Sequence, residues 1–115
     1  MRGFIAGCVA VVLTGTAALA DPVGKYDVAG TNPSGSTYSG TVSVQKTGDT
    51  FKITWNIGGA QYNGTAIGND EFLAVSYVSG SNTGLALLSE QGDEWKGIWT
   101  YAGGTKVGTE VWTKQ

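Results

Sequence analysis

Residues 50–59 read TFKITWNIGG, and this stretch decides the fold class. Its apolar side chains occupy every second position from Phe51 to Ile57, and polar side chains fill the positions between. A period of two places alternate side chains on opposite faces of a β-strand. The pair Gly58-Gly59 suits a two-residue hairpin turn, which requires positive φ angles. The stretch therefore predicts a strand with one buried face, followed by a tight turn.

Similar strand-like segments continue in both directions, with turn signals roughly every ten residues. Strands are expected at residues 23–30, 37–47, 51–57, 60–67, 71–79, 84–89, 95–101 and 106–113. The strand at 71–79 is apolar on both faces, which predicts a central or covered position. The links are too short for parallel crossovers, so an antiparallel up-and-down order is expected.

These strands predict an all-β protein, a single small antiparallel barrel of about eight strands. Closing the sheet on itself would remove its exposed edges. A two-layer β-sandwich built from the same hairpins is the alternative. The aromatic-x-Gly segments at 38–40, 62–64 and 95–97 form a weak repeat. Glycine inside strands predicts bending or close backbone approach where a sheet coils.

The first twenty residues have the three parts of a secretory signal peptide: a positive start, a short apolar run and an Ala-Leu-Ala end. Cleavage is expected after Ala20, leaving residues 21–115 as one β-barrel domain, exported to the periplasm or secreted. Lipidation at Cys8 is the alternative, but too little chain precedes it for insertion. No stable membrane insertion is expected after cleavage, because the apolar run is shorter than the roughly 20 residues of a spanning helix.

Composition excludes several classes of function. The sequence has no histidine and its one cysteine is Cys8, so His- or Cys-based catalytic triads and metal sites are not expected. Without the predicted signal peptide, the chain has six lysines and nine acidic residues. This net negative charge disfavours nucleic acid as a partner. We expect no enzyme activity, no catalytic residues, no bound metal and no cofactor.

Acidic residues offer little further chemistry. The pairs Asp70-Glu71 and Asp93-Glu94 fall at predicted turns, where carboxylates are ordinarily solvated. Glu110 lies inside a predicted strand. Its expected place is the outer face, paired with Lys96 or Lys106, and the alternative is an inward ligand-binding group.

The segment at 24–40, the strand at 54–59 and the ending at 97–113 resemble a group of small exported bacterial proteins often labelled fibronectin-binding. The resemblance covers nearly all of residues 21–115. It implies a binding protein, such as an adhesin-like module that contacts an extracellular protein.

The expected architecture also resembles calycin barrels, the lipocalins and avidins. The segment Gly24-Lys25-Tyr26 resembles their G-x-W opening with tyrosine in place of tryptophan. Residues 32–36 have the form of the avidin N-x-x-G-S element, which would imply biotin, but they stand farther from Tyr26 than in avidins. We interpret them mainly as a polar loop.

Two functions from different classes follow. The first is a surface that contacts an extracellular protein, and the second is a carrier of a small apolar or aromatic ligand in the barrel mouth. An interior cavity of a few hundred cubic ångströms, open at one end, would favour the carrier. The simplest role of the inward aromatic side chains is to fill the core. The candidate ligand-binding residues are Asn32, Ser36, Tyr38, Trp55, Tyr77, Trp95 and Trp99.

Overall fold

A computed structural model describes residues 21–115 and contains eight strands, as the sequence predicts. They are β1 (Gly24–Thr31), β2 (Thr37–Thr47), β3 (Thr50–Ile57), β4 (Ala60–Gly68), β5 (Phe72–Ser79), β6 (Asn82–Gln91), β7 (Glu94–Tyr101) and β8 (Gly108–Lys114). The predicted signal peptide and the alternative at Cys8 lie outside the described residues. The described part of the chain contains no helix that is long and apolar enough to cross a membrane.

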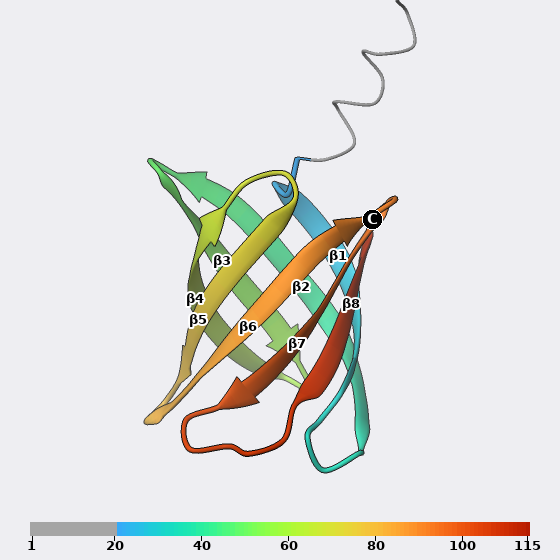
Figure 1. The fold of residues 1–115 in the computed structure, drawn as a ribbon, viewed down its shortest axis with the longest axis vertical. Helices are drawn as coiled ribbons and strands as arrows, with labels where there is room; N and C mark the ends of the chain where they lie inside the picture. The colour runs from blue at the N-terminus through green and yellow to red at the C-terminus, as the bar shows by residue number, and fades with distance from the viewer. Residues whose placement is uncertain (1–20) are drawn as a thin grey trace, which may run out of the picture.

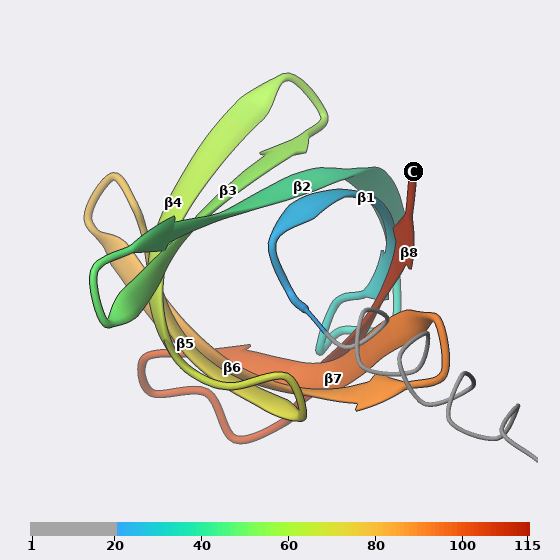
Figure 2. The same cartoon turned by 90° about the horizontal axis from the view of Figure 1, so that it is seen from above.

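The eight strands form one closed barrel in chain order, each antiparallel to its neighbours (Figure 1). β1 closes the ring by pairing with β8, with Val28 opposite Trp112. Viewed from above, the strands follow one another around a ring in which β1 lies beside β8 (Figure 2). The predicted barrel is therefore confirmed, and the alternative of a two-layer sandwich is wrong.

Alternation along the strands sorts side chains to the two faces of the sheet. On β3, Phe51, Ile53 and Trp55 are buried while Lys52 and Asn56 are exposed. One half of the interior, which we call the packed half, is filled by large side chains. It contains Tyr26, Val44, Phe51, Ile53, Leu73, Leu88, Trp95 and Trp112.

Glycines inside the strands stand where neighbouring backbone comes close. A Cβ atom at Gly40 would lie 2.3 Å from the carbonyl oxygen of Asn56, and one at Gly97 would lie 2.1 Å from that of Leu87. Such distances are far below any real contact, so the predicted close approach is present. These positions let a short sheet coil tightly enough to close.

Two of the strand predictions made from the sequence differ from the structure. Strand β5 is not covered on its outer face, because Phe72 is 55% exposed and Val78 is 48% exposed. Strand β8 begins at Gly108 rather than at residue 106, so the connection at 102–107 is longer than expected. Hydrogen bonds order this connection: Gly104 N donates to Tyr101 O at 2.8 Å, and Thr100 Oγ1 donates to Lys106 O at 2.9 Å.

Candidate ligand-binding site

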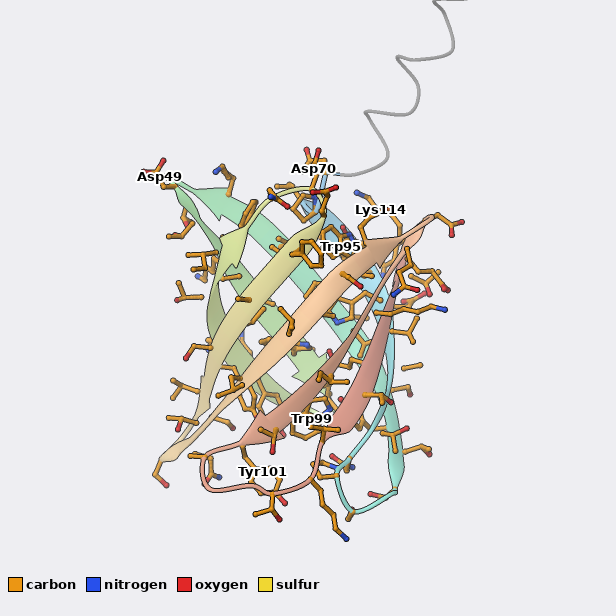
Figure 3. All side chains as sticks on the ribbon, in the orientation of Figure 1. Asp49, Asp70, Trp95, Trp99, Tyr101 and Lys114 are labelled. Atoms are coloured by element: carbon orange, nitrogen blue, oxygen red, sulfur yellow. The ribbon has the colours of Figure 1, made fainter. Side chains whose placement is uncertain are left out.

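A cavity of about 230 Å³ occupies one end of the barrel interior. At this end, which we call the mouth, β1, β3, β5 and β7 finish and their partners begin. In Figure 3, Trp99 and Tyr101 mark the mouth at the bottom, and Asp49, Asp70, Trp95 and Lys114 lie towards the opposite end. The cavity is lined by Asn32, Tyr38, Trp55, Ile57, Tyr62, Tyr77, Ala86, Trp99 and Glu110.

Glycines opposite aromatic residues make room for this cavity. Tyr38 pairs directly with Gly30, Tyr77 with Gly84, and Trp99 with Gly108. A Cβ atom on those glycines would lie 2.2, 2.3 and 2.7 Å from atoms of the respective aromatic side chains. Each ring therefore lies against the bare backbone of the adjacent strand. This arrangement leaves space in the mouth where the packed half has none.

The carboxylate of Glu110 is the polar centre of the cavity wall. Its Oε1 accepts hydrogen bonds from Trp55 Nε1 at 3.0 Å and Trp112 Nε1 at 2.7 Å. Its Oε2 accepts one from the Tyr38 hydroxyl at 2.5 Å. Strands β2, β3 and β8 thus meet at one side chain. Hydrogen bonds to a charged acceptor are stronger than neutral ones, so the network fixes the surrounding rings.

This position of Glu110 corrects the sequence-based expectation. The side chain faces the interior and is partly buried, so it pairs with neither Lys96 nor Lys106 on the outer face. Strand alternation explains the placement, since Gly108, Glu110 and Trp112 share one face of β8. Lys96 instead lies 3.7 Å from Glu94.

The negative charge of Glu110 contributes to raised pKa values of two cavity tyrosines. Burial raises the pKa of Tyr38 above its ordinary value, and the charge and hydrogen bond of Glu110 raise it further. Burial also raises the pKa of Tyr77, with Glu110 as the next cause. Both phenols are therefore neutral at neutral pH, and Tyr38 is a donor to Glu110.

The cavity rings form a chain of edge-to-face contacts. Tyr38 and Trp99 have centroids 6.2 Å apart at 74°, Tyr77 and Trp99 lie 6.2 Å apart at 70°, and Trp55 and Tyr77 lie 6.0 Å apart at 69°. Such pairs are favourable geometries that hold rings in place. The buried Trp99 Nε1 has no hydrogen-bond partner within residues 21–115. A buried donor without a partner is costly, and an acceptor on a ligand or water would satisfy it.

The structure brings five of the seven candidate residues together around the cavity: Asn32, Tyr38, Trp55, Tyr77 and Trp99. Two are not in its lining. Trp95 faces inward as expected but lies in the packed half, because it stands four positions before Trp99 on β7, about 13 Å along the strand. Figure 3 shows the two side chains towards opposite ends of the barrel. Ser36 is exposed in the β1–β2 loop, where its Oγ accepts a hydrogen bond from Asn32 Nδ2 at 3.0 Å.

Three lining residues were not among the candidates, Ile57, Tyr62 and Ala86, and Glu110 was considered only as the alternative to an outer-face position. Strand alternation could have suggested Tyr62, which shares an inward face with Gly64 and Ala66. Within the described range 21–115, no group of three or more His, Cys, Asp or Glu side chains could hold a metal ion. The turn pairs Asp70-Glu71 and Asp93-Glu94 therefore form no such cluster.

No protein-family model and no curated protein matches the sequence. Solved structures do match, although at low identity. A redesigned β-barrel, mFAP1, bound to DFHBI, has a TM-score of 0.66 and 20% identity, covering 84% of this chain and 96% of its own.

A second redesigned barrel, mFAP0, also bound to DFHBI, gives a TM-score of 0.67 and 19% identity over 81% of this chain and 98% of its own. A third redesigned barrel, b11L5F_LGL, gives a TM-score of 0.67 and 18% identity, covering 86% of this chain and 95% of its own. The chain shares the fold of redesigned β-barrels. At this identity the likeness extends to the fold alone.

Proposed function

We propose that the protein binds a small, largely apolar aromatic molecule in the cavity at the barrel mouth. The observation that carries this proposal is the aromatic-lined cavity of about 230 Å³ at one end of an otherwise filled interior. Ligand sites are typically concave and apolar, with a few fixed polar groups. Glu110 and the unpartnered Trp99 Nε1 supply such groups. We expect binding without turnover.

The similarity to redesigned barrels supports this proposal indirectly. Two of those barrels are bound to DFHBI, a small aromatic molecule. The same eight-stranded architecture can therefore hold a ligand of this class. Which molecule this chain binds must be determined by its own cavity residues.

Filling the cavity tests the proposal. Ala86 lines the cavity, and Ala86→Leu should occupy part of its volume and weaken DFHBI binding at least about tenfold. Ala74 is exposed on the outer face of neighbouring β5, so Ala74→Leu adds the same side chain outside the cavity. Binding would be measured from tryptophan fluorescence and from the indole N–H signals in NMR spectra. Equal affinities of both variants and the unaltered protein would contradict the proposal.

A second candidate function is contact with an extracellular protein, which the resemblance to proteins labelled fibronectin-binding implies. A row of outward residues supports it: Ile67 pairs with Ala74, Ala74 with Leu87, and Leu87 with Ile98. Three of them are large and exposed, at 62% for Ile67, 52% for Leu87 and 48% for Ile98. Contiguous exposed apolar surface often marks an interaction site.

Fibronectin binding can be measured directly on the immobilised protein. If the outer row is the contact surface, Leu87→Glu should abolish fibronectin binding and leave DFHBI binding unchanged. No binding of fibronectin by the unaltered protein would exclude this partner.

A further inference from the structure

The cavity wall carries a negative charge without a positive partner. Glu110 is the one charged residue among those that line the cavity. The ion pair found in residues 21–115 joins Lys96 to Glu94 and lies elsewhere. Charges removed from water are costly unless something compensates them. Three neutral donors offset part of this cost at Glu110, and a ligand with a positive group would neutralise the charge itself.

The groups that hold Glu110 are neutral, and they use most of its hydrogen-bonding capacity. The indole N–H groups of Trp55 and Trp112 can only donate, so Oε1 accepts both of them. Oε2 is engaged by the Tyr38 hydroxyl. These three hydrogen bonds use three of the roughly four acceptor sites of the carboxylate, so at most one site, on Oε2, is left for a primary ammonium. A quaternary ammonium needs no hydrogen bond and responds to the charge alone.

The rings beside Glu110 provide the second half of a cation site. Tyr38, Trp99, Tyr77 and Trp55 stand in successive contacts at 69–74°, so neighbouring walls of the cavity are nearly perpendicular. Aromatic boxes of this kind attract organic cations through the negative faces of their rings. Two lysine–ring contacts are found in the described part of the chain, Lys46 with Phe51 and Lys114 with Tyr26. Neither contact involves any of these four rings.

We propose that the mouth cavity selects small aromatic cations, in particular those with a quaternary ammonium group, over neutral molecules of the same shape. This inference rests on the proposed binding function. Glu110 supplies the charge, and the four rings supply the surface on which the methyl groups and the aromatic part of the ligand pack. The ligand's apolar part accounts for affinity, and its charge accounts for selectivity.

Two isosteric probes separate charge from shape. Phenyltrimethylammonium and tert-butylbenzene differ in having a charged nitrogen or a neutral carbon at the same position. We expect the unaltered protein to bind the cation at least about tenfold more tightly. NMR titration of the indole N–H signals of Trp55, Trp99 and Trp112 would report both affinity and location.

Matched variants assign the preference to Glu110. Glu110→Gln keeps a similar shape and should make the affinities for phenyltrimethylammonium and tert-butylbenzene about equal. Glu71→Gln removes the same charge from an exposed turn at the opposite end and should leave the preference unchanged. This control separates the local effect of Glu110 from the change in net charge.

The outcomes distinguish the two proposals. Equal or tighter binding of tert-butylbenzene by the unaltered protein would overturn the cation inference and leave the cavity as a binding site for neutral ligands. A full cation preference in Glu110→Gln would also overturn it. If tert-butylbenzene, phenyltrimethylammonium and DFHBI all leave the indole signals unmoved, the binding function itself is wrong, and the inference falls with it.

Discussion

Trp55 on β3 and Glu110 on β8 are joined by a 3.0 Å hydrogen bond from Nε1 to Oε1, although β1 and β2 separate their strands in the barrel. Trp112 donates to the same oxygen at 2.7 Å. The bond lies between the packed half and the mouth, since Trp55 belongs to the core and also lines the cavity. The network therefore couples stability to the shape of the site.

Removing the Glu110 carboxylate should destabilise the fold. Glu110→Ala leaves two indole N–H groups and one hydroxyl without their acceptor, and we expect a loss of about 3 kcal/mol in the free energy of unfolding. Glu110→Gln should lose about 1 kcal/mol, because its amide oxygen can still accept both indole bonds. Urea unfolding measures both values. Equal losses for the two variants would show that the hydrogen bonds contribute little.

Trp55→Ala should create a large cavity beneath the mouth. Trp55 is 4% exposed, and deletion of a buried tryptophan side chain typically costs about 3–5 kcal/mol. In a domain of this size such a loss can unfold most molecules. Denaturant titration followed by circular dichroism is the measurement. A loss below about 1 kcal/mol would contradict the core role of Trp55.

Two glycine substitutions should differ in whether they mainly reduce stability or mainly weaken ligand binding. Gly97→Ala directs a Cβ atom at the backbone oxygen of Leu87, which cannot move without opening the β6–β7 pairing, so we expect a loss of about 2 kcal/mol or more. Gly84→Ala meets the outer end of the Tyr77 ring, which can rotate into the cavity. It should cost less stability and weaken DFHBI binding more. Thermal unfolding and ligand titration of both variants would test this contrast.

Stability should fall at high pH through the buried tyrosines. Burial, followed by the charge of Asp21, raises the pKa of Tyr26 to about 12 from an unfolded value of 10.0. Between these values the unfolded chain releases a proton that the native chain keeps, so the free energy of unfolding decreases as pH rises. The contribution is complete below about pH 10. The raised pKa values of Tyr38 and Tyr77 act in the same direction.

Urea unfolding at steps from about pH 8 to 12 would reveal this decrease. Tyr26→Phe should show a shallower decrease, after a constant loss from the missing 2.7 Å bond between the Tyr26 hydroxyl and Pro22 O. Stability that stays constant up to pH 12 in the unaltered protein would contradict the prediction.

The β1–β2 loop should affect binding more than stability. Replacing both Asn32 and Ser36 with alanine removes their side-chain bond but keeps the backbone bonds from Asn32 N to Ser36 O and from Gly35 N to Asn32 O, each 2.8 Å. Ligand binding should weaken by roughly 1–3 kcal/mol, since Asn32 lines the cavity. Ser36→Ala alone is the control. A lower melting temperature with unchanged binding would make the loop a structural closure.

Local pattern was sufficient for the architecture of this protein. Alternation on β3 is determined by the chain's own geometry, and the turn at Gly58-Gly59 shows the expected positive φ angles of 60° and 83°. Eight such segments with short links leave few options other than an up-and-down barrel. The same alternation predicts Tyr38 and Trp99 on one face of their strands, whereas the strand at 71–79 is apolar on both faces in sequence and leaves the side of Tyr77 open.

Tertiary structure decided what the sequence pattern could not: the position along the barrel axis and the partners across it. Trp95 and Trp99 share one face of β7, but strand register places one in the packed half and the other at the mouth. Glu110 looked like a surface residue because carboxylates are usually solvated. Its three donors come from residues 38, 55 and 112, and only barrel closure brings them together. The cavity likewise depends on cross-strand pairs of glycine and aromatic residues, which are set by register rather than by neighbours in sequence.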